Sequence, residues 1–289
     1  MPKVNSNQKL RIAWKGRSLD FSLKTFIMGI LNVTPDSFSD GGKFYDTGRA
    51  VEQAVIMQEE GADIIDIGGE SSRPGAKPVP LDVELKRVLP ALKAIVKKIN
   101  VIVSIDTIKA GVAEAALSEG AEMVNDISSL RGDPNMASLL AKQEVPVVLM
   151  HMRGTTPQTM QSDIRYQDII SEITEFLTER ISFAQKSGIV PSRIIIDPGI
   201  GFGKSIEKDN FTVLKHLEKF MILEKPILVG PSRKAFLGHL LDLPVHDRGE
   251  ATAAATVVAI MNGANIVRVH DIKKIKRVVR IADAIKAAE

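Results

Sequence analysis

Short apolar runs alternate with longer amphipathic stretches along the chain. The runs are rich in Val, Ile and Leu and cover residues 26–31, 63–67, 101–105, 122–125, 146–150, 193–197, 226–230 and 265–269. Runs of this kind are typical of parallel strands buried on both faces. Apolar residues at helical spacing predict helices over 51–60, 81–98, 110–119, 136–142, 169–187, 207–220, 251–262 and 272–288. The pattern therefore predicts eight strand-then-helix units.

Turn residues mark where several of these elements end. The glycines that follow predicted helices fit a C-terminal cap, and they are Gly61, Gly120, Gly188 and Gly263. Before the first strand, residues 10–19 predict a small hairpin that turns at Lys15 and Gly16. We expect this hairpin, at about residues 9–20, to close the bottom of the structure formed by residues 26–288.

Eight such units predict an α/β fold, a (β/α)8 TIM barrel with a short N-terminal β-hairpin. The alternative is a doubly wound sheet, which would gather its functional groups at one switch point. Polar or glycine-rich residues follow every predicted strand, which favours the barrel. No Pro- or Ser-rich linker interrupts the sequence. We therefore expect one domain over residues 1–289.

Composition narrows the possible chemistry. The chain has 289 residues, of which 44% are hydrophobic, and it has no cysteine. The absence of cysteine excludes disulfides, thiolate metal sites and cysteine nucleophiles. The net charge of +3 and the 4% aromatic content argue against a nucleic-acid binder. Without a signal-peptide core or an 18-residue uncharged apolar run, we expect a soluble, cytoplasmic protein with no membrane contact.

Two cationic side chains follow each other on one face of the last predicted strand. Arg268 and His270 flank Val269, and the period of two along a strand points both to the same side. Such a pair at the end of an eighth barrel strand is a candidate phosphate or diphosphate site. The alternative is that Arg268 points inward and pairs with a carboxylate of a neighbouring strand. The pair alone leaves both interpretations open.

Three further strands end in side chains that form directional hydrogen bonds. Asp106, Asn125 and Asp197 occupy matching positions in SIDT, VNDI and IIIDPG. Converging on a barrel mouth, they could bind the amide and amino edge of a flat heterocycle. The more common role of a single such Asp is to cap the following loop. Three at matching positions favour a binding site.

Glycine-rich and loop segments supply the remaining candidates. Residues 197–205 do not match a phosphate-binding P-loop, because Pro198 stands where the first glycine is needed. We expect the glycines of this segment to let the backbone pass close to a ligand. The long segments 32–42 and 68–75 are typical of lids or second-substrate sites. Asn32 and Asp36 offer oxygen ligands that suit Mg²⁺, although Asp36 after Pro35 also fits a simple turn.

Taken in order, several segments resemble the dihydropteroate synthase family. They are GILNVTPDSFSDGG, DIGGESSRPG, SIDT, VNDI, MHMRGTT, DPGIGFGK, GPSRK and RVHD, and they run from Gly29 to Asp271. Each motif alone has low specificity, whereas the ordered set is highly specific. Ser72 departs from the family pattern, which usually has Thr at this position.

The resemblance implies a transferase of folate biosynthesis that is a sulfonamide target and forms a homodimer. With Mg²⁺, it would condense 6-hydroxymethyl-7,8-dihydropterin diphosphate with 4-aminobenzoate to give 7,8-dihydropteroate and diphosphate. The residues implied for the pterin are Asp106, Asn125, Asp197 and Lys234. Those implied for the diphosphate are Asn32, Ser72, Arg268 and His270, with Asn32 also a metal ligand. Those implied for 4-aminobenzoate are Phe38, Ser72, Arg73, Pro74, Phe202 and Ser232. The implied catalytic residues are Asp36, Arg73, Lys234, Arg268 and His270.

The residues and the implied reaction are chemically compatible. Preplaced cations would stabilise the departing diphosphate, and no protein nucleophile is required. We therefore expect a dissociative, SN1-like path. Two alternatives remain at this point: a pterin-dependent methyltransferase domain and a non-catalytic pterin-binding paralogue. The first would not need the arylamine segments, and the second would lack one of the site residues.

Overall fold

A closed parallel barrel forms the centre of the molecule. The structure, a computed structural model, describes residues 10–34, 47–71, 76–154, 160 and 164–288. In chain order the barrel strands are β3 (Phe26–Asn32), β4 (Ile64–Gly68), β5 (Ile102–Asp106), β6 (Met123–Asp126), β7 (Val147–Met150), β8 (Ile194–Asp197), β9 (Leu228–Val229) and β10 (Ile266–Val269). They pair in the order β8-β7-β6-β5-β4-β3-β10-β9. A parallel bridge between Ile196 and Ile227 closes the ring. The predicted (β/α)8 barrel is confirmed.

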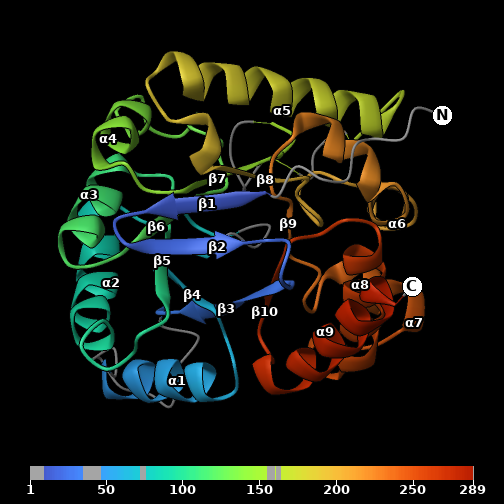
Figure 1. The fold of residues 1–289 in the computed structure, drawn as a ribbon, viewed down its shortest axis with the longest axis horizontal. Coiled ribbons are helices and arrows are strands. Elements are labelled where there is room, and N and C mark those ends of the chain that lie inside the picture. Colours follow the sequence, from blue (N-terminus) through green and yellow to red (C-terminus); the bar gives the residue numbers. More distant parts are fainter. Residues whose placement is uncertain (1–9, 35–46, 72–75, 155–159, 161–163, 289) are drawn as a thin grey trace.

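Helices surround the strands (Figure 1). They are α1 (Thr47–Glu59), α2 (Leu81–Ile95), α3 (Ala110–Ser118), α4 (Met136–Gln143), α5 (Ile169–Lys186), α6 (Asp209–Lys215), α7 (Ala235–Leu241), α8 (Gly249–Met261) and α9 (Ile272–Ala287). Short 3-10 helices cover Pro191–Arg193, Leu217–Leu223 and Val245–Asp247. The four predicted helix-ending glycines all have positive φ, from 97° to 107°, so the predicted caps are confirmed.

Two helical segments differ from the sequence-based expectation. The predicted helix 207–220 is broken at His216, whose φ of −114° and ψ of 28° separate α6 from the 3-10 turn Leu217–Leu223. Helix α7 was not predicted at all. It is short and contains Gly238, where a side-chain carbon would stand 2.1 Å from Nε of Arg248. Gly238, which packing against Arg248 requires, therefore interrupts the spacing of apolar residues that would have predicted a helix here.

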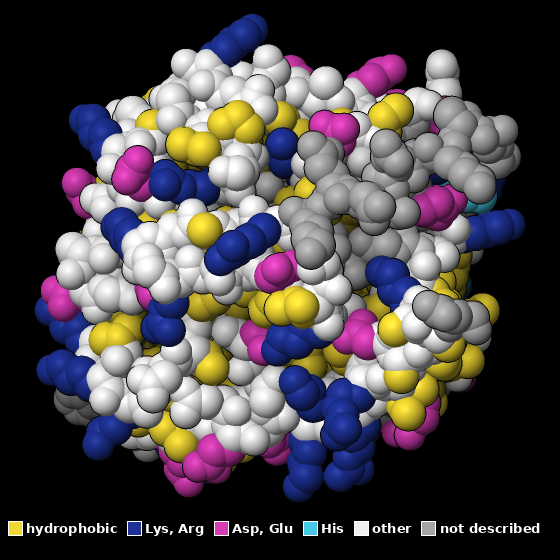
Figure 2. Space-filling model, in the orientation of Figure 1, with side chains coloured by type: hydrophobic (Ala, Val, Ile, Leu, Met, Phe, Trp, Pro, Cys, Tyr) yellow, Lys and Arg dark blue, Asp and Glu magenta, His cyan; other side chains and the backbone are white. Residues whose placement is uncertain are grey.

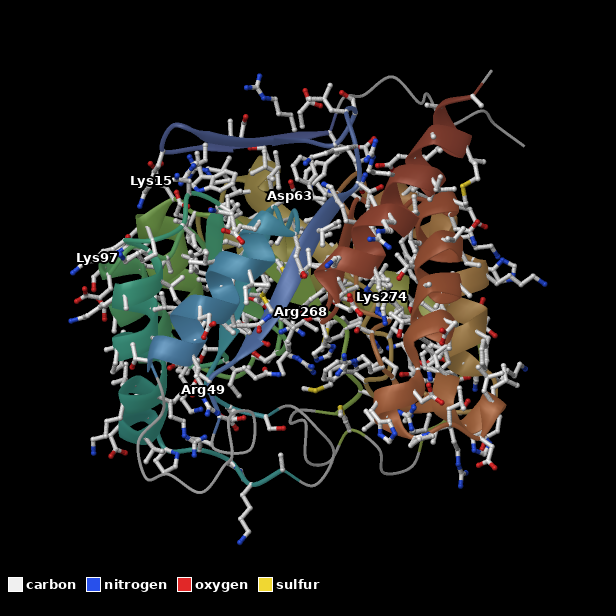
Figure 3. The ribbon with its side chains drawn as sticks, turned by 90° about the horizontal axis from the view of Figure 1, so that it is seen from below. Lys15, Arg49, Asp63, Lys97, Arg268 and Lys274 are labelled. Atoms are coloured by element: carbon white, nitrogen blue, oxygen red, sulfur yellow. The ribbon has the colours of Figure 1, made fainter. Side chains whose placement is uncertain are left out.

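The predicted hairpin covers one end of the barrel. Strands β1 (Arg11–Trp14) and β2 (Arg17–Asp20) are antiparallel, and Lys15 (φ 40°) and Gly16 (φ 81°) form a tight turn with positive φ at both positions. Ile12, Trp14 and Leu19 are buried against the core. In Figure 3 the hairpin lies at the same end as Asp63, which precedes β4, and Arg49 of α1 lies at the opposite end. The hairpin therefore seals the amino ends of the strands.

Strand register sets which side chains meet inside the barrel. Gly68 of β4 pairs with Asp106 of β5, and Asp106 pairs with Asn125 of β6. One layer deeper, Asp66 pairs with Ser104. Asp66 is fully buried, so its charge must be compensated by a partner inside the barrel.

The outer surface carries charges of both signs. On the face shown in Figure 2, the Lys and Arg side chains lie among Asp and Glu side chains, as the small net charge predicts. None of the helices that the structure describes has the length and hydropathy required to cross a membrane.

Candidate active site

A buried arginine links three strands inside the barrel. Nε of Arg268, on β10, donates to Oδ2 of Asp66 over 2.6 Å, and its Nη2 donates to Oδ2 of Asp106 over 2.7 Å. Asn125 Nδ2 donates to the same Asp66 oxygen over 2.9 Å. Figure 3 shows Arg268 inside the barrel, between the two ends marked by Asp63 and Arg49. The inward ion pair considered from the sequence is therefore present.

This ion pair does not use all of the arginine's donors. A guanidinium carries five N–H groups, and the two bonds to carboxylates occupy Nε and one hydrogen of Nη2. Nη1 has no hydrogen-bond partner among the described residues. Arg268 can therefore be fixed by two carboxylates and still donate to an anion at the mouth.

Asp197 and Lys234 lie on the other side of the site. Oδ1 of Asp197 accepts a hydrogen bond from the backbone N–H of Gly199 over 2.7 Å, so this carboxylate caps its own loop through one oxygen. Its second oxygen has no partner among the described residues. Lys234 Nζ lies 4.2 Å from the centroid of the Phe202 ring, a cation–π contact that holds the ammonium group at this position.

Burial shifts the charges of these groups toward neutrality. It raises the pKa of Asp106 to about 7, against the effect of Arg268, and raises the pKa of Asp197 to about 6. It lowers the pKa of Lys234 to about 8, although Asp197 acts in the opposite direction. The pKa of Arg268 is raised, because the nearby carboxylates outweigh its desolvation. Three groups of the site thus titrate near neutral pH, as is common at functional sites.

A second contact connects the ends of β9 and β10. Ser232 Oγ lies 2.9 Å from Nδ1 of His270 and accepts a hydrogen bond from the His270 backbone N–H over 3.2 Å. The contact at Nδ1 orients the imidazole, so that Nε2 points away from Ser232. The predicted cation pair, Arg268 and His270, is thus held by partners from β4, β5 and the segment after β9.

Beside Asp106 the surface is hollowed into a small cleft. Its lining residues are Glu70, Ser71, Glu84, Asp106, Thr107, Ile108 and Ile127. At the end of β4, a side-chain carbon built at Gly68 would lie 3.6 Å from Oδ1 of Asn32 and 3.7 Å from Oδ2 of Asp106. Because Gly68 has no side chain, the space between Oδ1 of Asn32 and Oδ2 of Asp106 stays open.

Sequence comparison places the chain among known enzymes. Residues 28–270 match the family described as pterin binding enzyme. A dihydropteroate synthase of Synechocystis sp. is 46% identical over 267 residues, which cover 92% of both chains. The chain belongs to the dihydropteroate synthase family.

Solved structures of this family share the fold closely. The Yersinia pestis dihydropteroate synthase in a sulfonamide drug complex is 41% identical, with a TM-score of 0.90 over 96% of this chain and all of that one. The Xanthomonas albilineans synthase with 4-aminobenzoic acid is also 41% identical, with a TM-score of 0.90 over 97% of this chain and all of that one.

The structure brings together most of the residues implied by the family motifs. The barrel mouth contains Asn32, Asp106, Asn125, Asp197, Phe202, Ser232, Lys234, Arg268 and His270. Asp36, Phe38, Ser72, Arg73 and Pro74 lie outside the described residues. Their roles, and the ligand assigned to each residue, stay predictions.

Three functional features were missed from the sequence. Asp66 supports both Arg268 and Asn125, but inside an apolar run it gave no signal of its own. Lys204 is buried with 1% exposure, although lysines are rarely buried. The glycine prediction also needs correction: a side-chain carbon at Gly199 would stand 1.8 Å from the backbone oxygen of His151. The absence of a side chain at Gly199 therefore allows close contact with the backbone of His151, which follows β7, rather than with a ligand.

Proposed function

We propose that the chain condenses 6-hydroxymethyl-7,8-dihydropterin diphosphate with 4-aminobenzoate to give 7,8-dihydropteroate and diphosphate. The observation that carries this proposal is the convergence of Asp106, Asn125, Asp197 and Lys234 around Arg268 at one barrel mouth. The family relationship and the 4-aminobenzoic acid and sulfonamide named with the two solved relatives support it.

The residues at the mouth divide into two chemical groups. The second oxygen of Asp197 and the amide of Asn125 match the amino and amide edge of a pterin, and Lys234 donates to a ring acceptor. Arg268 and His270 would bind the negatively charged diphosphate. In this proposal the Asp197 carboxylate would lie beside the positive charge that develops on the pterin, and Arg268 and His270 would lie beside the negative charge of the departing diphosphate.

The same division favours a dissociative path. As the C–O bond breaks, the electron pair leaves with the diphosphate, and Arg268 and His270 stabilise that charge without rearranging. The pterin methylene cation is stabilised by the neighbouring carboxylates, and the arylamine nitrogen then attacks and releases a proton. No protein nucleophile takes part, which agrees with a chain that has no cysteine.

The donor set also fits Mg²⁺. Oδ1 of Asn32 faces the space left by Gly68, and oxygen ligands combined with substrate phosphates are what this ion prefers. No group of three or more His, Asp or Glu side chains among the described residues forms a complete metal site. We therefore assign Asn32 as a ligand of an ion that the diphosphate helps to hold. Bound Mg²⁺ would supply charge neutralisation of the leaving group.

We further propose that the protein is a cytoplasmic homodimer. Exposed apolar side chains lie on α7, α8 and α9, and α8 packs against both of the other two helices. They are Leu240, Leu241, Val258, Met261, Ile281 and Ile285. An exposed apolar surface of this kind is typical of a protein interface. Light scattering should give the mass of a dimer, and Ile281→Glu should shift it toward 31.5 kDa. A monomeric wild type would contradict the proposal.

One assay tests the reaction directly. The chain is mixed with the dihydropterin diphosphate and 4-aminobenzoate, and both diphosphate and 7,8-dihydropteroate are quantified with Mg²⁺ and with EDTA. We expect equal amounts of the two products, and loss of turnover with EDTA. Pterin binding without turnover would favour a non-catalytic paralogue, and methyl transfer from a methylated pterin would favour a methyltransferase.

A further inference from the structure

Lys204 is enclosed beneath the active site and makes three polar contacts. Its Nζ donates to the backbone oxygens of Gly199 over 2.8 Å and Phe202 over 3.1 Å, and lies 3.1 Å from Nδ1 of His151. Burial lowers the pKa of Lys204 to about 7, and in its charged form the ammonium group has three N–H donors and no acceptor. These contacts match that number if Nδ1 of His151 accepts.

The state of His151 agrees with this arrangement. Burial and the charge of Lys204 lower the pKa of His151 well below its usual value, so the imidazole is neutral and can accept at Nδ1. Its ring packs edge-on against Phe176 of α5, with 4.9 Å between the ring centroids. His151 is therefore a fixed acceptor to which Lys204 can be anchored.

Lys204 holds a turn whose backbone conformation favours glycine at three positions. Gly199, Gly201 and Gly203 all have positive φ, of 72°, 83° and 61°. Two further bonds hold the same turn: Tyr166 Oη donates to the oxygen of Gly203 over 2.6 Å, and Asn210 Oδ1 accepts from the Gly201 N–H over 2.7 Å. Glycine loses the most backbone freedom on ordering. Such a turn therefore needs many bonds to keep one shape.

The same glycine-rich turn carries two contacts of the proposed active site. Its Gly199 N–H binds the Asp197 carboxylate, and its Phe202 ring lies against Lys234 Nζ. Lys204 bonds to the carbonyl oxygens of these same two residues, Gly199 and Phe202. Its side chain is 1% exposed, so it supports the site from behind without reaching a substrate.

We propose that Lys204 is a positioning residue for the synthase reaction, acting through the turn that orients Asp197 and Phe202 toward Lys234. The inference rests on the proposed function for its kinetic consequences. It also has a consequence for ligand binding that does not require turnover, because Asp197 and Lys234 are assigned to the pterin.

The test is Lys204→Met, which keeps the length of the side chain and removes all three donors. The matched control is Lys208→Met, the same change at an exposed position four residues later. Two quantities are measured for folded variants: kcat/KM for 4-aminobenzoate, and the Kd of 6-hydroxymethyl-7,8-dihydropterin by calorimetry. We expect Lys204→Met to lower kcat/KM and to weaken pterin binding by about 10-fold or more, as loss of a charged hydrogen bond does. Lys208→Met should change neither by more than about twofold.

A double-mutant cycle separates positioning from a general loss of structure. Phe202→Leu is made in the wild type and in Lys204→Met. If Lys204 acts through Phe202, the second substitution should have much less effect on kcat/KM in the Lys204→Met background. Full additivity, or unchanged pterin binding in Lys204→Met, would overturn the proposal.

Two remaining outcomes are also informative. Should Lys204→Met not fold, Lys204→Gln retains N–H donors without the charge, and Tyr166→Phe removes a different bond to the same turn. Weaker pterin binding in both variants supports the proposal, and wild-type binding in both refutes it. A wild type that binds pterin without turnover refutes the proposed function alone, and the binding comparison then decides the role of Lys204.

Discussion

Asp66 offers a quantitative test of how the interior of the barrel is held together. Its carboxylate is fully buried and accepts bonds from Arg268 and Asn125 through one oxygen, Oδ2. Its other oxygen has no partner among the described residues. Replacing Asp66 with alanine removes both bonds and leaves the guanidinium in a buried site with Asp106 as its remaining counter-ion.

The size of the effect follows from the ion pair and the chain length. Breaking a buried pair by removing one partner costs about 3–5 kcal/mol. We expect the lower value, about 3 kcal/mol, because Arg268 keeps Asp106. At about 2.1 cal/mol/K per residue, a chain of 289 residues has an unfolding entropy of about 0.6 kcal/mol/K. Asp66→Ala should therefore lower the Tm by about 5 °C.

Ser104 supplies the matched control. It pairs with Asp66 across the two strands, it is fully buried, and its hydroxyl has no partner among the described residues. Ser104→Ala should change the free energy of unfolding by less than about 1 kcal/mol. Calorimetry and urea unfolding of both variants measure the difference. If Asp66→Ala is as stable as Ser104→Ala, the network does not stabilise the barrel and our reasoning is wrong.

Three further predictions concern ligands and packing. Arg268→Ala should weaken binding of the dihydropterin diphosphate far more than binding of the free pterin, because we assign the open donors of Arg268 to the diphosphate. Calorimetry measures both affinities, and equal losses would mean that the anion site is misplaced. Binding of the free pterin should decrease below about pH 7 and again below about pH 6, because Asp106 and Asp197 have pKa values raised to about 7 and about 6 and become neutral there. It should also decrease above about pH 8, where Lys234 loses its proton; a flat profile from pH 5 to 9 would refute this assignment. Gly199→Ala should greatly reduce the yield of folded protein, because its side-chain carbon would stand 1.8 Å from a backbone oxygen, and wild-type stability of this variant would contradict the packing we describe.

Most of the fold could be predicted from the sequence because local patterns determine most of it. Each barrel strand lies in a short, mostly apolar run, and the helix-ending glycines have positive φ, a conformation that favours glycine. The ends of parallel strands meet at one edge, so the positions of Asp106, Asn125 and Asp197 along the chain were enough to assign them to a common site.

The features that were missed depend on partners far away in the chain. Asp66 is recognisable only from its bond to Arg268, 202 residues later. Lys204 is recognisable only from its contact with His151, 53 residues earlier. Contacts over such distances in the chain produce no repeating sequence pattern, and a single charged residue in a segment is usually on the surface. Sequence reasoning therefore found the residues that face the ligand better than the residues that support them.

The hairpin over the amino ends of the strands has an electrostatic consequence. Because Ile12, Trp14 and Leu19 are buried at that end, apolar side chains lie behind the central network and water can approach it only from the carboxyl end. At this closed end the ion pairs of Arg268 with Asp66 and Asp106 are shielded from solvent on the inner side. Because buried ion pairs are screened much less than exposed ones, the contribution of this network to stability should change little as salt is added.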